Sequence, residues 1–388
     1  MTTDTLALPL LDLSRLDAGG AARQAFLDQL RAAARDVGFF YLRGHGVPEA
    51  LVAQVKAEAR RFFALPEADK LAIEMVHSPH FRGYTRAAWE RTRGEPDWRE
   101  QFDIGAERAV IPQGPGVPPW LRLQGPNQWP EAQPALKTTL LRWQAELTRV
   151  AIRLLEAFAT ALGQAGDALE PIYGDTPNQH IKIIRYPGRE ATGSGQGVGA
   201  HKDSGFLTLL LQDTQRGLQV EGEDGRWIDA EPVPGTFVVN IGELLELATN
   251  GYLRATVHRV ITPPAGTDRL SVAFFLGARL DATVPLLDLP PALAAEARGP
   301  ASDPPEPAVP RCRPELPEGP AALAPRRGAA PLRRRPGGPS RHRLNTPRHR
   351  AGLGSGAQLH PFHFTHHVIP AKAGISLQIG ARSPLSRG

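Results

Sequence analysis

The chain has 388 residues, and its charge is distributed unevenly along the sequence. Residues 299–388 carry 14 Lys and Arg against 4 Asp and Glu, whereas residues 1–298 carry 31 against 36. This mildly acidic body argues against specific nucleic-acid binding, which needs clustered basic residues. The single cysteine, Cys312, lies in the basic tail, which excludes disulfides, zinc fingers, Fe–S clusters and cysteine nucleophiles from the body.

The N-terminal run MTTDTLALPLLDLSRLD lacks a basic start, and Pro9 and Asp12 interrupt its short apolar stretch. This pattern argues against a signal peptide. No segment of the sequence approaches the roughly 20 apolar residues that a membrane span needs. We therefore expect a cytoplasmic protein without a membrane partner.

The first part of the chain has mainly helical periodicity. Apolar residues at helical spacing predict a helix over residues 22–37, and the run FFYLRGHGV (39–47) predicts a strand with a glycine-rich exit. A second helix is expected between Pro48 and Pro66. After Pro134, apolar residues recur every three or four positions as far as Gly163, which predicts a long packing helix.

From His180 onward, short β-rich runs are separated by turn signals such as Asp224-Gly225 and Pro234-Gly235. Their spacing of roughly 8–12 residues favours a β-sandwich or barrel. We divide the chain into an N-terminal region of helices plus a strand, a linker with the long helix, a β core and a tail. Their ranges are 1–110, 111–175, 176–298 and 299–388.

The tail of residues 299–388 is rich in Pro, Arg and Gly, and Glu318 is its last acidic residue. This composition is typical of disorder. Because the texture changes abruptly, we also hypothesise that the chain is read out of frame after about Asp303. A genuine flexible basic tail is the alternative, and sequencing the locus would distinguish the two.

Three residues of the β-rich part form a candidate metal site. Since residues i and i+2 of a strand share a face, His201 and Asp203 are expected to point inward together. His258, in the run ATVHRVI, is the candidate third ligand from a distant strand. Two histidines and one carboxylate form the facial triad of non-haem Fe(II) oxygenases, although these ligand types also suit Mn, Co or Ni.

A candidate anion site follows in the sequence. Arg269 and Ser271 share one strand face, and a buried Arg is costly unless it meets an anion. A guanidinium beside a hydroxyl suits a carboxylate. The alternative is an ion pair between Arg269 and a core acid such as Glu243 or Glu246.

The order H-x-D, distal His and R-x-S resembles the isopenicillin N synthase-like branch of the 2-oxoglutarate/Fe(II)-dependent dioxygenase superfamily. The segments LPLLDLSRL, GFFYLRGHGVP, DWREQFDIG, IKIIRYPG and FVVNIGELLELATNG are similar to that family as well. The resemblance covers roughly residues 7–300. It implies an α+β fold: a distorted double-stranded β-helix (jelly-roll) core with an N-terminal helical region and a long packing helix.

The resemblance also implies roles for particular residues. His201, Asp203 and His258 would be the Fe(II) ligands, Arg269 and Ser271 would bind the distal carboxylate of 2-oxoglutarate, and Tyr186 would reach a co-substrate or substrate carboxylate. The implied reaction uses O2 to oxidise a small molecule, above all by hydroxylation, with release of succinate and CO2.

The sequence departs from the family pattern in three places. Ile184 stands where many plant relatives have Asn, Glu243 stands where the family motif has Asp, and the basic tail replaces a C-terminal helix. Four alternatives stay open: a 2-oxoglutarate-independent oxidase of the isopenicillin N synthase type, an ethylene- and succinate-forming enzyme, the inactive product of a frameshifted gene, and a binding protein. The sequence names neither the substrate nor the oligomeric state.

Overall fold

The computed structural model describes residues 8–301 and does not describe residues 1–7 and 302–388. The predictions for the tail, including the change of reading frame, therefore fall almost wholly outside the described residues. Residues 8–301 belong to one compact unit. The division of the chain at residues 110, 175 and 298 stays a prediction.

The described residues form eight α-helices, three 3-10 helices and fourteen strands. The helices are α1 (Gly20–Asp36), α2 (Glu49–Phe63), α3 (Glu67–Leu71), α4 (Pro134–Ala161), α5 (Glu170–Tyr173), α6 (Arg189–Thr192), α7 (Glu243–Ala248) and α8 (Pro291–Ala294), with 3-10 turns at Leu13–Leu16, Met75–His77 and Pro119–Leu123. The strands are β1 (Leu10–Asp12), β2 (Phe39–Arg43), β3 (Gly83–Thr85), β4 (Arg91–Thr92), β5 (Glu95–Pro96), β6 (Glu100–Gly105), β7 (Asn178–Tyr186), β8 (Gln196–His201), β9 (Leu207–Gln212), β10 (Leu218–Glu221), β11 (Trp227–Asp229), β12 (Phe237–Ile241), β13 (His258–Ile261) and β14 (Arg269–Gly277).

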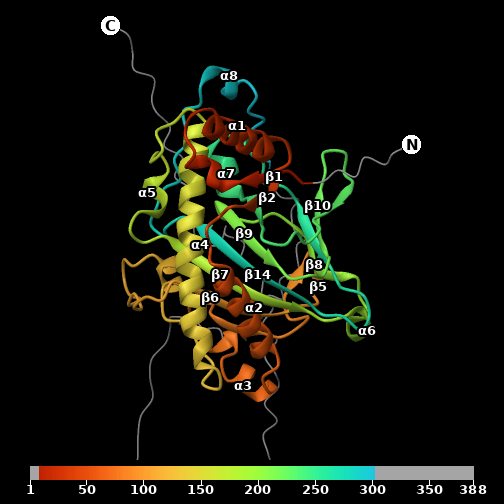
Figure 1. The fold of residues 1–388 in the computed structure, drawn as a ribbon. Coiled ribbons are helices and arrows are strands. Elements are labelled where there is room, and N and C mark those ends of the chain that lie inside the picture. Colours follow the sequence, from red (N-terminus) through yellow and green to blue (C-terminus); the bar gives the residue numbers. More distant parts are fainter. Residues whose placement is uncertain (1–7, 302–388) are drawn as a thin grey trace, which may run out of the picture. The chain divides into compact units, whose positions relative to one another are not determined.

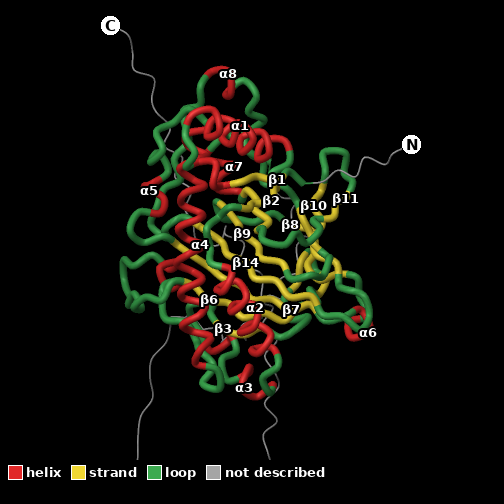
Figure 2. Tube along the Cα trace, viewed as in Figure 1, coloured by secondary structure: helices red, strands yellow, loops and turns green. Residues whose placement is uncertain are grey.

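Two sheets build the β core. The major sheet has the order β1-β2-β12-β9-β14-β7-β6-β3 and the minor sheet the order β11-β10-β13-β8. All neighbours in both sheets are antiparallel except β1 and β2. Side chains of both sheets meet in one buried cluster between them, and Figure 2 shows the strands gathered in this region. The mixed α+β class and the jelly-roll core are as predicted.

Helix α4 covers the opposite face of the major sheet, with α1 and α2 beside it (Figure 1). Its apolar side chains recur at helical spacing, so one stripe of the helix is fully buried. Trp143, Leu147 and Leu154 are the centre of that stripe. The long packing helix predicted between Pro134 and Gly163 is therefore confirmed, as are the two earlier helices.

Side chains alternate between the two faces of the central strands, so that one set packs against the helices and the other against the minor sheet. In β7, Ile183 faces the helices whereas Ile184 and Tyr186 face the minor sheet. In β14, Phe274 faces the helices and Ala273 the minor sheet. Because successive strand residues point to opposite faces, every second side chain of these strands is directed into the space between the sheets.

The N-terminal region contributes more strands than its sequence predicts. Strand β2 ends at Arg43, and the predicted glycine-rich exit follows it, since Gly44 and Gly46 adopt positive φ angles of 64° and 73°. The strands β1, β3 and β6 are not foreseen in the sequence, yet all three belong to the major sheet. The N-terminal region thus supplies part of the β core as well as its helical cover.

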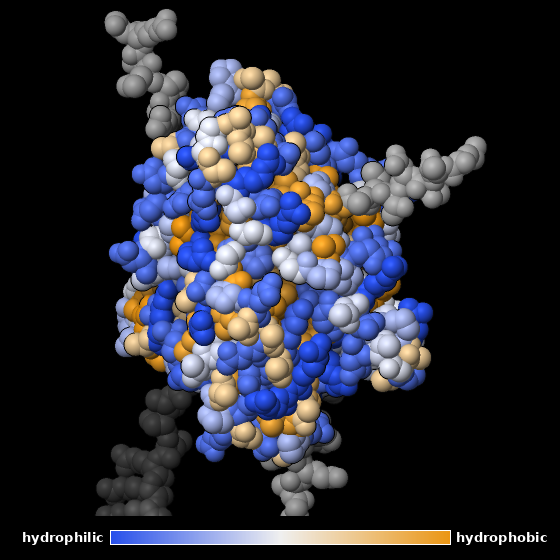
Figure 3. All heavy atoms as spheres, viewed as in Figure 1, coloured by the Kyte–Doolittle hydropathy of each residue, from blue (hydrophilic) through white to orange (hydrophobic). Residues whose placement is uncertain are grey.

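Within residues 8–301, no helix is both long and apolar enough to cross a membrane. On the face of the molecule seen in Figure 3, hydrophobic residues are scattered among hydrophilic ones.

Candidate metal and co-substrate site

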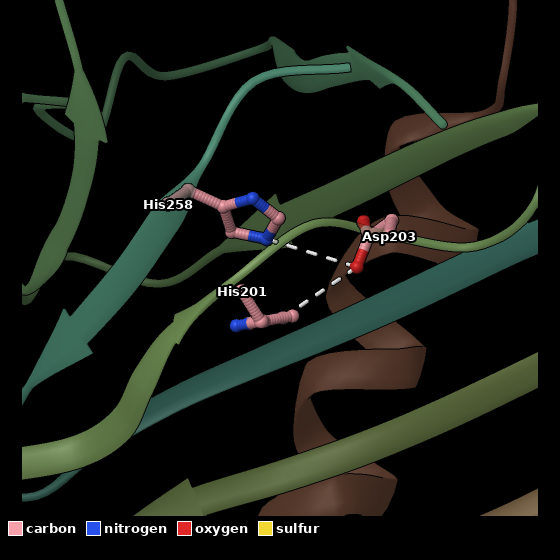
Figure 4. A group of neighbouring side chains, drawn as sticks. All are labelled: His201, Asp203 and His258. Atoms are coloured by element: carbon pink, nitrogen blue, oxygen red, sulfur yellow. Dashed lines mark ion pairs between the residues drawn. The ribbon is translucent and has the colours of Figure 1, made fainter. Parts of the chain in front are cut away.

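The three predicted metal ligands meet between the two sheets (Figure 4). His201 is the last residue of β8 and His258 the first residue of β13, and the register of these two strands pairs them directly. Asp203 lies in the loop between β8 and β9. The prediction that His201 and Asp203 share a strand face is therefore wrong. The strand ends at His201, and the turn that follows brings Asp203 back toward both imidazoles.

One carboxylate oxygen of Asp203 is directed at both histidines. Its Oδ1 lies 3.6 Å from His201 Nε2 and 3.7 Å from His258 Nε2. The other ring nitrogens are occupied by backbone carbonyls: His201 Nδ1 lies 2.8 Å from Gly199 O and His258 Nδ1 lies 3.2 Å from Thr256 O. A carbonyl can only accept, so each Nδ1 carries a proton, and Nε2 is the nitrogen of each ring that is left to bind a metal.

The second carboxylate oxygen of Asp203 is held by two neutral donors. Thr208 Oγ1 donates to Oδ2 at 2.6 Å, and Asn240 Nδ2 donates to the same atom at 2.9 Å. Thr208 and Asn240 are directly opposite each other in the β9–β12 pair. Their hydrogen bonds fix the carboxylate plane and leave Oδ1 as the atom that faces the histidines.

The electrostatics of the group favour an ionised carboxylate. Burial by itself opposes ionisation of Asp203, but His258, His201 and Thr208 together hold the pKa of its carboxyl far below its usual range. Burial, with His201 as a neighbour, lowers the pKa of His258 to about 4. A charged Asp203 beside a neutral His258 is the protonation state that metal binding requires.

The predicted anion site lies in the same cavity. Arg269 is fully buried, and only its Nη2 has a partner, donating to Gln212 Oε1 at 2.9 Å. Its Nε and Nη1 have no hydrogen-bond partner among residues 8–301, and neither has the hydroxyl of the buried Ser271. The guanidinium lies 5.0 Å from the centre of the Tyr186 ring. Buried donors without partners are costly, so this cluster fits an incoming carboxylate.

An ion pair of Arg269 with a core acid was the alternative interpretation of this residue. Among the described residues Arg269 forms no ion pair. Glu246 instead lies 3.3 Å from Lys202 Nζ and accepts a hydrogen bond from the backbone of Ala255. The open nitrogens of Arg269 are therefore available to a ligand.

A single cavity joins the triad to Arg269 and Ser271, and its remaining walls are largely apolar. The apolar lining includes Phe39, Val198 and Leu218. Phe39 also packs edge-on against His258, with ring centres 5.2 Å apart. These side chains come from both sheets, so the site exists only once the jelly roll is closed.

Sequence reasoning missed three polar residues of the site: Thr208, Gln212 and Asn240. Thr208 and Gln212 share the inward face of β9 within the otherwise apolar run LTLLLQ, and both are buried. A polar residue repeated at even spacing in such a run is the signal that could have found them. Asn240 stands in the segment FVVNIG, which resembled the family without suggesting a role for the residue.

Two families of known proteins match the chain. Residues 177–278 match the 2OG-Fe(II) oxygenase superfamily. Residues 8–132 match the family described as non-haem dioxygenase in morphine synthesis N-terminal.

Individual proteins are similar over most of the described residues. The 2-oxoglutarate-dependent dioxygenase frbJ of Dothideomycetidae sp. (strain 11243) is 38% identical, over 74% of this chain and 79% of that protein. The homoarginine-6-hydroxylase 2-ODD-C23.1 of Arabidopsis thaliana is 38% identical, over 74% of this chain and 90% of its own. The crystal structure of a 2OG-Fe(II) oxygenase family protein from Caulobacter crescentus has a TM-score of 0.62 at 31% identity, covering 72% of this chain and 90% of that one.

Proposed function

Since the chain belongs to the 2OG-Fe(II) oxygenase superfamily, we propose that His201, Asp203 and His258 hold its Fe(II). We propose further that Arg269 and Ser271 bind the distal carboxylate of 2-oxoglutarate. The observation that carries the proposal is one cavity that contains two Nε2 lone pairs, one open carboxylate oxygen and two open guanidinium nitrogens. The enzyme is a non-haem Fe(II) dioxygenase that oxidises a small molecule with 2-oxoglutarate and O2.

The bound iron, with 2-oxoglutarate and O2, supplies the oxidation of a substrate C–H bond together with release of succinate and CO2. The protein's own residues orient and enclose the reactants. Gly199 and Thr256 carbonyls fix the imidazole tautomers, while Thr208 and Asn240 fix the carboxylate. Arg269 would hold the distal carboxylate of the co-substrate, and Tyr186, whose ring centre lies 5.0 Å from the guanidinium, would lie within reach of it. The apolar walls limit the access of water.

We propose homoarginine as the first substrate to test, because a relative that is 38% identical over most of its length bears the name homoarginine-6-hydroxylase. We also propose that the protein is cytoplasmic and has no specific nucleic-acid partner, as expected from the sequence. Incubation of the Fe(II)-loaded enzyme with 2-oxoglutarate and homoarginine should yield succinate and a product with one additional oxygen, detected by mass spectrometry.

The site itself can be tested without knowing the substrate. Titration of 2-oxoglutarate into the anaerobic Fe(II)-loaded full-length chain should produce a visible charge-transfer band that saturates. The same titration with Arg269→Ala should need about 10- to 100-fold more 2-oxoglutarate, which is the worth of a charge-assisted hydrogen bond. Arg216→Ala is the matched control, because the Arg216 side chain is 74% exposed.

An absent band in folded, iron-binding protein would contradict the proposed co-substrate site and favour the oxidase that works without 2-oxoglutarate. Failure to bind iron would contradict the ligand assignment. A saturating band with unchanged affinity in Arg269→Ala would leave the iron site standing and remove Arg269 from the co-substrate site.

A further inference from the structure

A second guanidinium, that of Arg99, borders the same cavity. Arg99 lies between β5 and β6, and its side chain is only 10% exposed. Strand β7 separates β6 from β14 in the major sheet. Arg99 and Arg269 therefore reach the cavity from opposite sides of β7, with Tyr186 and Ile184 between them.

Arg99 uses only one of its three nitrogens. Its Nη2 donates to Glu90 Oε2 at 2.7 Å and lies 3.6 Å from Asp97 Oδ2. Its Nε is buried without a partner, and Nη1 has no hydrogen bond to any residue in the range 8–301. Arg185, on the outward side of β7, has all three nitrogens engaged by Glu100 and Asp268.

The acids beside Arg99 hold it in place. Asp97 accepts hydrogen bonds from the backbone of Gly199, at 3.1 Å, and from Thr92, at 2.8 Å. Gly199 belongs to β8, the strand that ends at His201. Glu90 accepts a hydrogen bond from Gln101 Nε2 at 3.1 Å. The guanidinium is thus fixed relative to the metal ligands, while two of its nitrogens stay open.

A fixed guanidinium that keeps N–H groups without partners suits a carboxylate, because charge-assisted hydrogen bonds to a carboxylate are short and strong. The distal carboxylate of 2-oxoglutarate is already assigned to Arg269 and Ser271. Phe275 and Val198 line the same cavity and can cover an apolar stem. The cavity therefore combines an anion anchor with an apolar wall beside the proposed iron site.

Resting on the proposed function, we infer that Arg99 binds the carboxylate of the primary substrate, and that this substrate is a small free carboxylic acid of the amino-acid class. Arg99 thus has a role distinct from that of Arg269 and Ser271 in the co-substrate site. Substrate recognition would be lost without Arg99, whereas binding of iron and 2-oxoglutarate would persist.

The test compares acids with their amides. Calorimetric titration of the full-length Fe(II)·2-oxoglutarate protein, under anaerobic conditions, uses two pairs of probes: L-homoarginine with L-homoargininamide, and L-arginine with L-argininamide. In the unmodified protein, at least one acid should bind more than about 10-fold tighter than its amide. In Arg99→Gln, the acid should bind about 10- to 100-fold more weakly, and the preference over the amide should disappear.

Three variants make the result specific. Arg91→Gln removes the same charge from an exposed neighbour in β4 and should change nothing. Arg99→Lys keeps the charge beside Glu90 and Asp97, so it should fold even if Arg99→Gln does not. It should still lose most of the preference, because an ammonium lacks the fixed, planar set of donors of a guanidinium. Lys182→Gln removes the ammonium that lies 3.4 Å from Asp103 and should leave the preference intact.

Four results would overturn the inference: equal binding of acid and amide, no binding of either acid, loss of the preference in Lys182→Gln instead of the Arg99 variants, or a loss of 2-oxoglutarate affinity in Arg99→Gln as large as that in Arg269→Ala. The absorbance band of the 2-oxoglutarate complex separates these outcomes from failure of the proposed function. If the band saturates normally, the function stands and only the role of Arg99 is wrong.

Discussion

Two buried aspartates, Asp203 and Asp103, show how differently this fold treats a carboxylate. Asp203 has one oxygen bound by two neutral donors, while the other lies 3.6 and 3.7 Å from two imidazole nitrogens. Asp103 of β6 has both oxygens engaged at short range, by His180 at 2.7 Å and by Gln101 at 2.7 Å. Asp203 thus has one oxygen that faces two imidazoles at more than hydrogen-bond distance, whereas both oxygens of Asp103 are hydrogen-bonded within the protein.

The surroundings of Asp103 form a network that connects strands. Lys182 of β7 lies 3.4 Å from Asp103 and 3.8 Å from Glu90, and Gln101 bonds both acids. Burial opposes ionisation of Asp103, but Lys182 and His180 lower the pKa of its carboxyl to about 2. This network joins the segment around residue 90 to the major sheet.

The two aspartates differ in whether the polar atoms around them have partners within the protein. Both carboxylate oxygens of Asp103 have hydrogen-bond partners within the protein, so burial of this carboxylate costs little and its contacts join neighbouring strands. In the cavity beside Asp203, two nitrogens of Arg269 and the hydroxyl of Ser271 are buried without partners, which costs stability unless a ligand binds there. Buried polar atoms without partners therefore mark the cavity that contains the proposed metal and co-substrate site.

The largest expected effect comes from removing the open carboxylate. Asp203→Ala should abolish turnover and weaken Fe(II) binding by more than the 10- to 100-fold typical of losing an outer hydrogen-bond partner, because a direct ligand is lost. Anaerobic equilibrium dialysis with Fe(II) measures this. Asp229→Ala, at an exposed aspartate of β11, is the control; retained iron affinity in Asp203→Ala would contradict the assignment.

The next effect concerns the open guanidinium. Arg269→Lys keeps a positive charge but not the planar fork, so 2-oxoglutarate should bind with an affinity between those of the unmodified protein and Arg269→Ala. The anaerobic absorbance titration gives the three affinities. An affinity of the Lys variant equal to that of the unmodified protein would show that charge alone, without fork geometry, holds the co-substrate.

A smaller effect tests the closed oxygen of Asp203. Thr208→Val removes one of its two donors and leaves Asn240, so Fe(II) affinity should fall about 10- to 100-fold. Thr148→Val removes another buried hydroxyl, which donates to Gln144 O within α4, and should leave iron affinity unchanged. Equal iron affinities in the two variants would mean that Asn240 alone fixes the carboxylate.

The smallest effect belongs to Asp103 and appears only in acid. Its pKa falls from 3.8 to about 2 on folding, so its stabilisation is present above pH 4 and is lost as the pH drops toward 2. Urea unfolding at pH 5 and pH 3 should therefore show a smaller acid destabilisation in Asp103→Asn than in the unmodified protein, whereas Fe(II) affinity at neutral pH should persist.

Much of the candidate site was predictable from sequence because the proposed ligands lie on short, regular signals. His258 and the pair Arg269 and Ser271 stand in β-rich runs whose inward faces follow from strand alternation. The helix after Pro134 was predictable because its apolar stripe spans its full length. These features depend on local periodicity, which a single sequence contains.

Other features were decided by tertiary structure alone. Asp203 reaches the histidines from a loop, because β8 ends at His201 and the chain must turn before β9 begins. Thr208, Gln212 and Asn240 acquire their roles only when β9 and β12 pair and close over that loop. The strands of the N-terminal region, and with them Arg99, join the cavity through contacts between segments far apart in the sequence. The sequence by itself thus determined which residue types were present and which faces they shared, whereas the closed sheets decided which polar atoms were satisfied and which stayed open, because hydrogen-bond partners are set by distances that only the folded chain defines.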